Sequence, residues 1–152
     1  MSTSPISHRT TIRDAVLAMF ESRRGADGMR VKEFDMSRYW IGPDQCARFP
    51  TYCVLVTDEV PGEKTQRTVN FGLTLTVVIY AKDDHDPRRA LDAAIEDVYE
   101  TMLLVQDTID EEISWQFSLQ ELSSDDGTSI AHPYALAVQR WQCEHRRPKM
   151  AA

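Results

Sequence analysis

Residues 68–82 restrict the possible folds more than any other segment of the chain. From 69 to 79 every odd position is apolar, and from 68 to 76 every even position is Thr, Asn or Gly. Side chains alternate between two faces in a strand, whereas a helix repeats every 3.6 residues. The pattern therefore predicts a long strand ending at Lys82, with one buried and one polar face, as in an antiparallel sheet with one solvated side.

Further strands are expected on both sides of this one. Residues 51–60 predict a partner strand, joined to the long strand by a hairpin turn at 61–64 that contains Pro61 and Gly62. A second hairpin is expected after Asp110, with a strand that alternates from Ile113 to Gln120, a turn at 123–128 and a strand over 130–143. The tail at 146–152 is expected to be flexible.

A first helix is predicted over residues 10–24. Ile12, Val16, Met19 and Phe20 recur at the spacing of one helical face, and Gly25 ends the helix. The following segment, 26–50, has no sustained period apart from a strand-like piece at 29–35. It is long for a connection inside one domain, so we expect either a functional arm or an unrecognised strand.

A second helix is predicted to begin at Asp86, the N-cap, with Pro87 in the first helical position. One stripe of this helix is apolar, and it consists of Leu91, Ala94, Ile95, Val98, Met102 and Val105. The opposite side is acidic, with Asp92, Glu96, Asp97 and Glu100. Leu104 lies among these acids, which indicates a contact with a neighbouring subunit.

The order helix, arm, hairpin, helix, hairpin predicts a single domain over residues 1–152. Its fold class is expected to be α+β: a two-layer arrangement with one four-stranded, mainly antiparallel sheet and the helices on one face.

Charge and composition exclude several classes of protein. The net charge is −7, and residues 83–112 hold 11 acidic side chains against two arginines. This balance argues against a protein that wraps nucleic acid, which needs clustered Lys and Arg. Three cysteines without CxxC spacing argue against a disulfide framework and a zinc cage. We find no signal peptide and no apolar run of the roughly 20 residues that cross a membrane, so a soluble cytoplasmic chain is expected.

The sequence shows no catalytic signature. Asp83, Asp84, His85 and Asp86 form the densest group of potential metal ligands, but the calcium-loop glycine is missing, and a loop that caps a helix is the simpler interpretation. Cys53 with His132 is a conceivable nucleophile and base, although Cys53 lies within an apolar strand and is better explained as a buried small residue. We therefore expect no enzyme, no metal and no cofactor.

Three groups of residues are candidates for a subunit or partner interface. Arg38, Tyr39 and Trp40 have the composition of an interface anchor, or else belong to a loop folded over the core. Arg88 and Arg89 lie at the positive end of the second helix. They either contact the carboxylates Asp92, Glu96, Asp97 and Glu100 of another copy, with Leu104 or Trp40 as an apolar centre, or neutralise acids of their own loop. The hairpin tips carry the remaining candidates, which are Lys64, Arg67, Asp125 and Asp126.

The sequence resembles the tail terminator, or tail-completion, proteins of long-tailed bacteriophages. The resemblance covers most of the chain and depends on the order, length and patterning of its elements. It runs from the helix end at 21–25 through 48–56, the alternating strand at 69–81, the helix start at 86–92 and the last two strands.

The resemblance implies a hexameric ring at the head-proximal end of the tail tube. The ring would stop polymerisation of the tube protein and join the tail to the head-to-tail connector or neck protein. DNA would pass through without specific binding, and the acidic helix would line the channel or face solvent. The protein would be a virion component assembled in the host cytoplasm, without a membrane partner. The alternatives are a head-closure or neck protein, and a small ligand-binding or adaptor domain outside phages.

Overall fold

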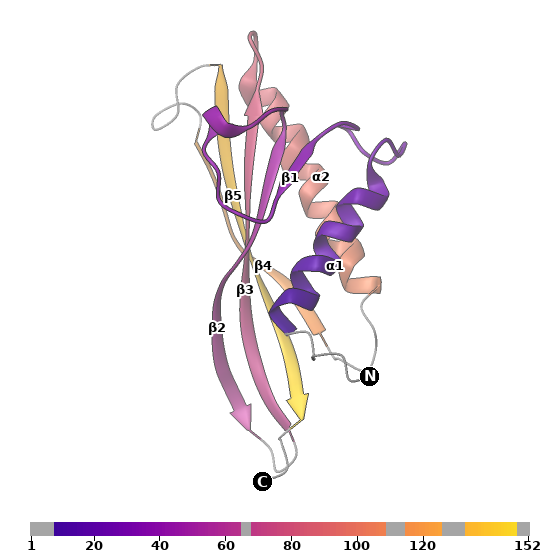
Figure 1. The fold of residues 1–152 in the computed structure, drawn as a ribbon, viewed down its shortest axis with the longest axis vertical. Helices are drawn as coiled ribbons and strands as arrows, with labels where there is room; N and C mark the ends of the chain where they lie inside the picture. Colours follow the sequence, from indigo (N-terminus) through magenta and orange to yellow (C-terminus); the bar gives the residue numbers. More distant parts are fainter. Residues whose placement is uncertain (1–7, 65–67, 109–114, 126–132, 149–152) are drawn as a thin grey trace, which may run out of the picture.

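A computed structural model describes residues 8–64, 68–108, 115–125 and 133–148 (Figure 1). The elements in chain order are α1 (His8–Arg23), β1 (Asp35–Ser37), the short 3-10 helix η1 (Pro43–Gln45), β2 (Thr51–Lys64), β3 (Thr68–Lys82), α2 (Pro87–Thr108), β4 (Trp115–Asp125) and β5 (Tyr134–Pro148). The fold is α+β, as predicted from the sequence.

The described residues form a sheet of five strands instead of the predicted four, in the order β1-β2-β3-β5-β4. β2 and β3 form one antiparallel hairpin, β4 and β5 form the other, and β3 joins them by pairing with β5. The additional strand β1 runs parallel to β2, with Asp35 opposite Thr51 and Ser37 opposite Cys53, so the sheet is mixed. The arm therefore contains a strand. It begins at Asp35, the last residue of the strand-like piece that the sequence indicated at 29–35.

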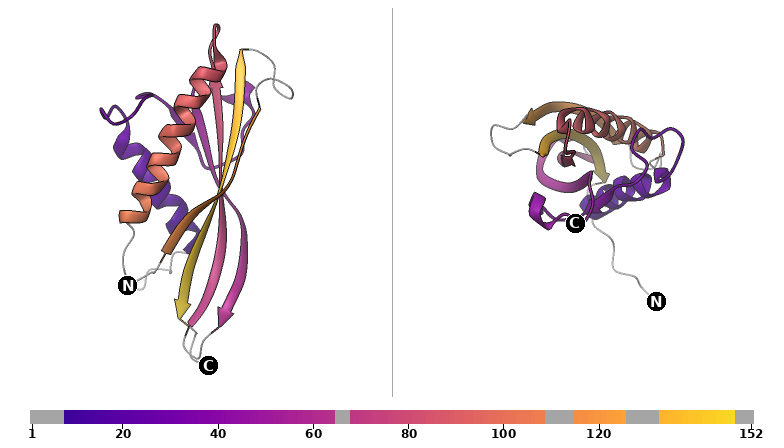
Figure 2. Two further views of the ribbon diagram at one scale, coloured as in Figure 1. Left: turned by 180° about the vertical axis from the view of Figure 1, so that it is seen from behind. Right: turned by 90° about the horizontal axis from the view of Figure 1, so that it is seen from above.

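Both helices lie on one face of the sheet, as expected (Figures 1 and 2). Leu73, Leu75, Val77 and Ile79 of β3 are fully buried in the core, where the apolar stripe of α2 is also at most 9% exposed. Phe71, nearer the lower end of β3, is half-buried. The alternation along β3 and the periodicity of α2 thus specify the two surfaces that pack together.

The opposite face of the sheet is not polar throughout, which corrects the sequence prediction. Cys53, Val78 and Tyr80 are buried there in a second, smaller core. The arm covers them, because its residues Ile41, Cys46 and Phe49 pack against this cluster. The polar face was predicted from positions 68–76, whereas the next two even positions are Val78 and Tyr80.

Several predicted turns are strand in the structure. β2 continues to Lys64, so the proposed turn at 61–64 is strand with an irregular register between Pro61 and Lys64. β4 includes 123–125 of the second predicted turn, and β5 includes 146–148 of the predicted tail. Residues 126–128 and 149–152 of these predictions lie outside the described residues. The length of β3 explains the extension of β5, since the two strands pair from Lys82 opposite Tyr134 to Thr68 opposite Pro148.

The lower parts of β2, β3 and β5 extend past the helical layer as a three-stranded ribbon (Figure 1). The ribbon forms because β3, at 15 residues, is longer than the part of the sheet that the helices cover. No helix of the described residues is long and apolar enough to cross a membrane.

Leu75→Ala tests the assignment of the buried face. Because Leu75 is fully buried beneath the helices, we expect the free energy of unfolding to fall by about 2–5 kcal/mol in urea denaturation. The control Val60→Ala, at a strand position that is 57% exposed, should cost less than about 1 kcal/mol. A near-neutral Leu75→Ala variant would contradict the packing described here.

Candidate subunit interface

The arm is attached to α2 by the buried carboxylate of Asp97. One carboxylate oxygen accepts a hydrogen bond from the Arg30 backbone N–H at 2.9 Å, and the other accepts one from the Val31 N–H at 2.8 Å. Asp97 is 0% exposed, which corrects its placement on the open acidic side of the helix. Helical periodicity locates Asp97 on the flank of α2, but it does not show that the arm's backbone covers that flank.

Basic side chains surround this contact and pair with acids of α2. The Arg30 guanidinium lies 3.4 Å from Asp97 and 3.0 Å from Glu100. Arg23, in the last turn of α1, donates to the Thr101 hydroxyl at 2.7 Å. The hydrogen bond from Arg30 holds the pKa of Glu100 below its ordinary value. Glu100, predicted as an interface residue, is thus already paired with Arg30 of its own chain.

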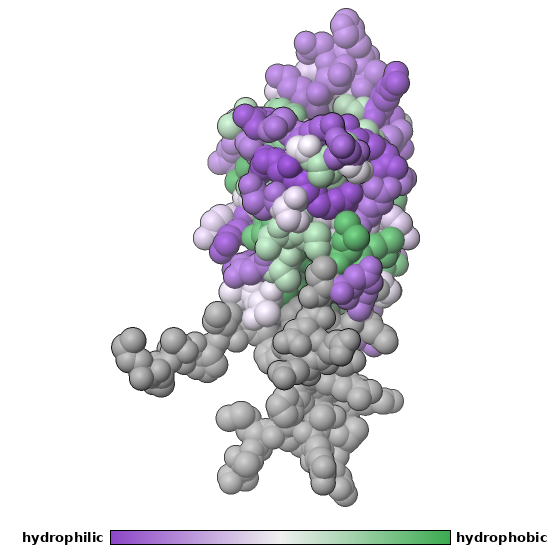
Figure 3. All heavy atoms as spheres, turned by 90° about the vertical axis from the view of Figure 1, so that its right-hand side faces the viewer, coloured by the Kyte–Doolittle hydropathy of each residue, from purple (hydrophilic) through white to green (hydrophobic). Residues whose placement is uncertain are grey.

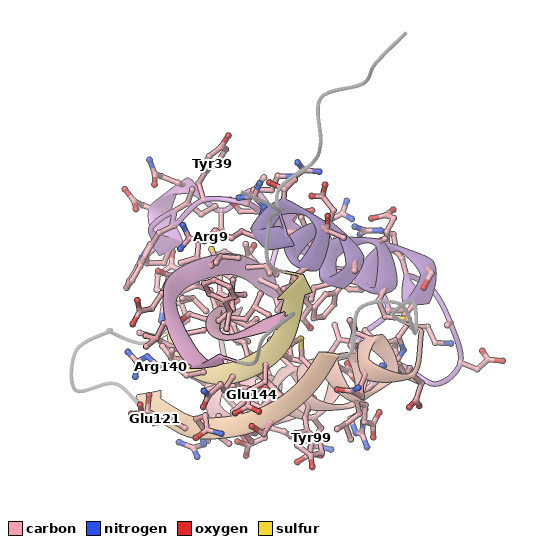
Figure 4. The ribbon with its side chains drawn as sticks, turned by 90° about the horizontal axis from the view of Figure 1, so that it is seen from below. Arg9, Tyr39, Tyr99, Glu121, Arg140 and Glu144 are labelled. Carbon is pink, nitrogen blue, oxygen red and sulfur yellow. The ribbon has the colours of Figure 1, made fainter. Side chains whose placement is uncertain are left out.

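The aromatic residues of the arm are both exposed and held in place. Tyr39 is 75% exposed and Trp40 is 66% exposed. The Trp40 indole N–H donates to the Tyr80 hydroxyl at 3.2 Å, and the Tyr39 N–H donates to the Ser37 hydroxyl at 3.1 Å. Figure 4 shows Tyr39 at the rim of the molecule, pointing away from it. Both interpretations of this segment, an interface anchor and a loop folded over the core, therefore apply in part. The adjoining arm residues cover the sheet, while Tyr39 and Trp40 face outward.

Arg38 lies at the edge of a shallow groove between α1 and the arm. Its guanidinium is 3.6 Å from the Asp14 carboxylate. The groove has a volume of about 370 Å³ and is lined by Asp14, Leu17, Ala18, Glu21, Met36, Ser37 and Arg38. The ion pair is exposed on both sides, so it orients Arg38 more than it stabilises the fold.

The start of α2 has the predicted cap and an ion pair within the helix. Asp86 accepts a hydrogen bond from the Arg89 N–H at 3.1 Å, as an N-cap does. Asp83 accepts hydrogen bonds from the backbone N–H groups of His85 and Asp86 at 2.8 and 2.9 Å, so this acidic loop caps the helix. The Arg88 guanidinium donates to Asp92 one turn further along, at 3.1 Å. The role of Arg88 and Arg89 between subunits stays a prediction.

Apolar side chains are exposed on the outer side of α2. Tyr99 and Leu104 are each 39% exposed, and Leu103 is 44% exposed. The exposure of Leu104 agrees with its predicted position outside the buried stripe. Tyr99 and Leu103 were not predicted as interface residues, although their i, i+4 spacing next to Glu96 indicates one exposed helical face. On the side of the molecule that carries the helices, Figure 3 shows a mostly hydrophilic surface with smaller hydrophobic areas towards its middle.

The cysteines are poorly suited to nucleophilic chemistry. Cys53 is fully buried, as the sequence indicated, and burial raises the pKa of its thiol. Burial also raises the pKa of Cys143 to about 12. His132, the conceivable base, lies outside the described residues, and within those residues no group of three His, Cys, Asp or Glu side chains could hold a metal ion.

Four predicted interface residues cannot be placed. Arg67 and Asp126 lie outside the described residues, as do the side chains of Lys64 and Asp125 at the ends of β2 and β4. Comparison of the sequence with models of protein families and with curated proteins finds no match.

Asp97→Ala tests the attachment of the arm. Hydrogen bonds to a charged acceptor contribute about 1.5–3 kcal/mol each, so losing two should lower the free energy of unfolding by about 3 kcal/mol or more. Hydrogen exchange should accelerate at the amides of Arg30 and Val31. The control Asp92→Ala removes an exposed carboxylate of the same helix and should change stability by about 0.5 kcal/mol at most. Unchanged exchange at both amides would contradict the proposed attachment.

The ion pair of Glu100 predicts a pH dependence. Because its pKa is lowered by folding, its stabilising contribution is full above the ordinary value of 4.5 and is lost as the pH falls through the folded-state pKa. The stability difference between wild type and Glu100→Gln, measured in urea at pH 7 and pH 3, should therefore narrow at pH 3. The matched variant Glu96→Gln removes an exposed carboxylate one turn earlier in α2 and controls for the loss of one surface charge. A Glu100→Gln difference that persists at pH 3 would refute the assignment.

Proposed function

We propose that this chain is the tail terminator of a long-tailed bacteriophage. In this proposal six copies form a ring at the head-proximal end of the tail tube, stop the polymerisation of the tube protein and bind the head-to-tail connector or neck protein. The role is structural, without catalysis or a cofactor. The protein is assembled in the host cytoplasm and remains in the virion.

The observation that carries the proposal is the three-stranded ribbon that extends past the helices. Sheet edges that run past their helical cover are templates for pairing with another chain. In the described residues, β1 pairs with β2 only from Thr51 to Cys53, and past Cys53 no further strand of these residues adds to this edge of the sheet. Such an edge suits a subunit whose projection is completed by neighbouring copies or by the tube.

The charge distribution also supports a ring through which DNA passes. Segment 83–112 carries a net charge of −9, and Asp92 and Glu96 are exposed on α2. Carboxylates repel phosphate, so a channel wall of this kind would let DNA move without holding it.

Tube assembly provides the test of this proposal. The tube protein whose gene neighbours that of this chain is polymerised with and without the purified chain, and the tubes are measured by negative-stain electron microscopy. We expect shorter tubes and gold-labelled chain at one end only. An acid-unfolded sample of the same chain serves as the control. Tubes of unchanged length without end labelling would refute the terminator function. If the chain has no effect on tubes but its gold label is found at the head vertex of intact virions, the neck protein is favoured instead.

A further inference from the structure

Two exposed aromatic patches lie on opposite sides of the molecule. The arm patch consists of Arg38, Tyr39 and Trp40, and the flank patch consists of Tyr99 and Leu103 of α2. Seen from below along the long axis, Tyr39 lies at one side of the molecule and Tyr99 at the opposite side (Figure 4). Exposed aromatic groups are typical centres of protein interfaces.

The arm patch is organised before any partner binds. Hydrogen bonds fix the Trp40 indole to Tyr80 and the Tyr39 backbone to Ser37, and the Ser37 hydroxyl also donates to the Tyr39 carbonyl at 2.7 Å. Side chains that are already ordered lose less entropy on association, which favours affinity.

The flank patch is part of one outward stripe of α2. Asp92, Glu96, Tyr99 and Leu103 follow one another at spacings of four, three and four residues, which places them on the same helical face, and all four are exposed. The Tyr99 ring lies against the buried Trp141, with ring centroids 5.7 Å apart, so it is supported from below. The flank patch is therefore an ordered apolar surface with carboxylates at one end.

The charges around the two patches are complementary. Arg38 belongs to the arm patch, and Arg9 of α1 lies on the same side as Tyr39 in Figure 4. On the opposite side, the exposed carboxylates of Asp92 and Glu96 extend the stripe of Tyr99 and Leu103, and Asp92 also accepts a hydrogen bond from Arg88 of its own helix. Complementary charge orients two surfaces and accelerates their association.

We propose that the arm patch of one copy docks on the flank patch of the next, head to tail, and that this contact joins neighbouring copies of the chain. The proposal rests on the ring-forming function proposed above and names the surfaces that form the ring. Two different patches on opposite sides produce a heterologous contact, which generates rings when the rotation closes, whereas a two-fold dimer requires one patch that binds itself.

Two variants that each disable one patch provide the test. Trp40→Glu removes the arm anchor and Leu103→Glu places a charge in the flank patch; both positions are exposed, so circular dichroism should confirm that the variants fold. Each variant alone should associate about 30-fold or more weakly than wild type, as expected for a hot-spot residue. The control is Leu122→Glu on β4, whose 48% exposure matches the 44% of Leu103. Its mass in analytical ultracentrifugation should equal that of wild type.

Mixing the two variants distinguishes this contact from other kinds of association. The intact arm patch of Leu103→Glu can bind the intact flank patch of Trp40→Glu. The other two patches in this complex carry the substitutions, so no third copy can bind. An equimolar mixture should therefore form a complex of two copies and no larger species, whereas each variant alone stays monomeric.

Several results would overturn the inference. These are a wild type that remains monomeric at every concentration, variants that assemble like wild type, a mixture that stays monomeric, or a Leu122→Glu control that is equally impaired. The tube experiment decides the terminator function separately. Copies that join through these patches but leave tubes unaffected would refute that function alone, and variants that still assemble and cap tubes would refute the docking contact alone.

Discussion

The structure depends on β3, which is hydrogen-bonded to a strand on each side and separates two unlike faces of the sheet. Its odd positions from Leu73 to Ala81 form the floor of the main core under α1 and α2. Val78 and Tyr80, on the other face near its upper end, form the floor of the second core under the arm. Every exposed group of the proposed interface is therefore held by an element that packs on one of these faces. The proposed interface is held rigid because these elements pack on the central strand.

Asp97 attaches the arm, which covers the far face of the sheet, to α2 on the other face. The chain leaves α1, passes the flank of α2 and continues to the far face of the sheet, and the carboxylate holds it at the point where it passes. A buried carboxylate is costly unless its oxygens are hydrogen-bonded, and here each of them accepts a backbone N–H. The path of the arm towards Tyr39 and Trp40 is thus fixed first at Asp97 and then by the pairing of β1 with β2.

The sequence predicted the elements whose periodicity and caps are local, and missed those that depend on distant partners. The extent of β3 and the start of α2 follow from the sequence, because alternation, Asp86 and Pro87 are local signals. β1 was misplaced because it is three residues long and forms only by pairing with β2. Pro61 and Gly62 resemble a turn but lie at a register shift within β2. Of the candidate interface, the aromatic arm was predicted from composition, whereas the packing of Tyr99 on Trp141 was not predictable because the two residues are remote in sequence.

The contacts of Asp97 with the arm have a consequence for sequence divergence. Both main hydrogen bonds are donated by main-chain N–H groups, which every amino acid except proline possesses. Positions 30 and 31 can therefore exchange side chains while the loop keeps its path, as long as neither becomes proline. Related chains could thus vary the surface that meets a partner and still present it at the same place on a common scaffold, with the carboxylate as the invariant element.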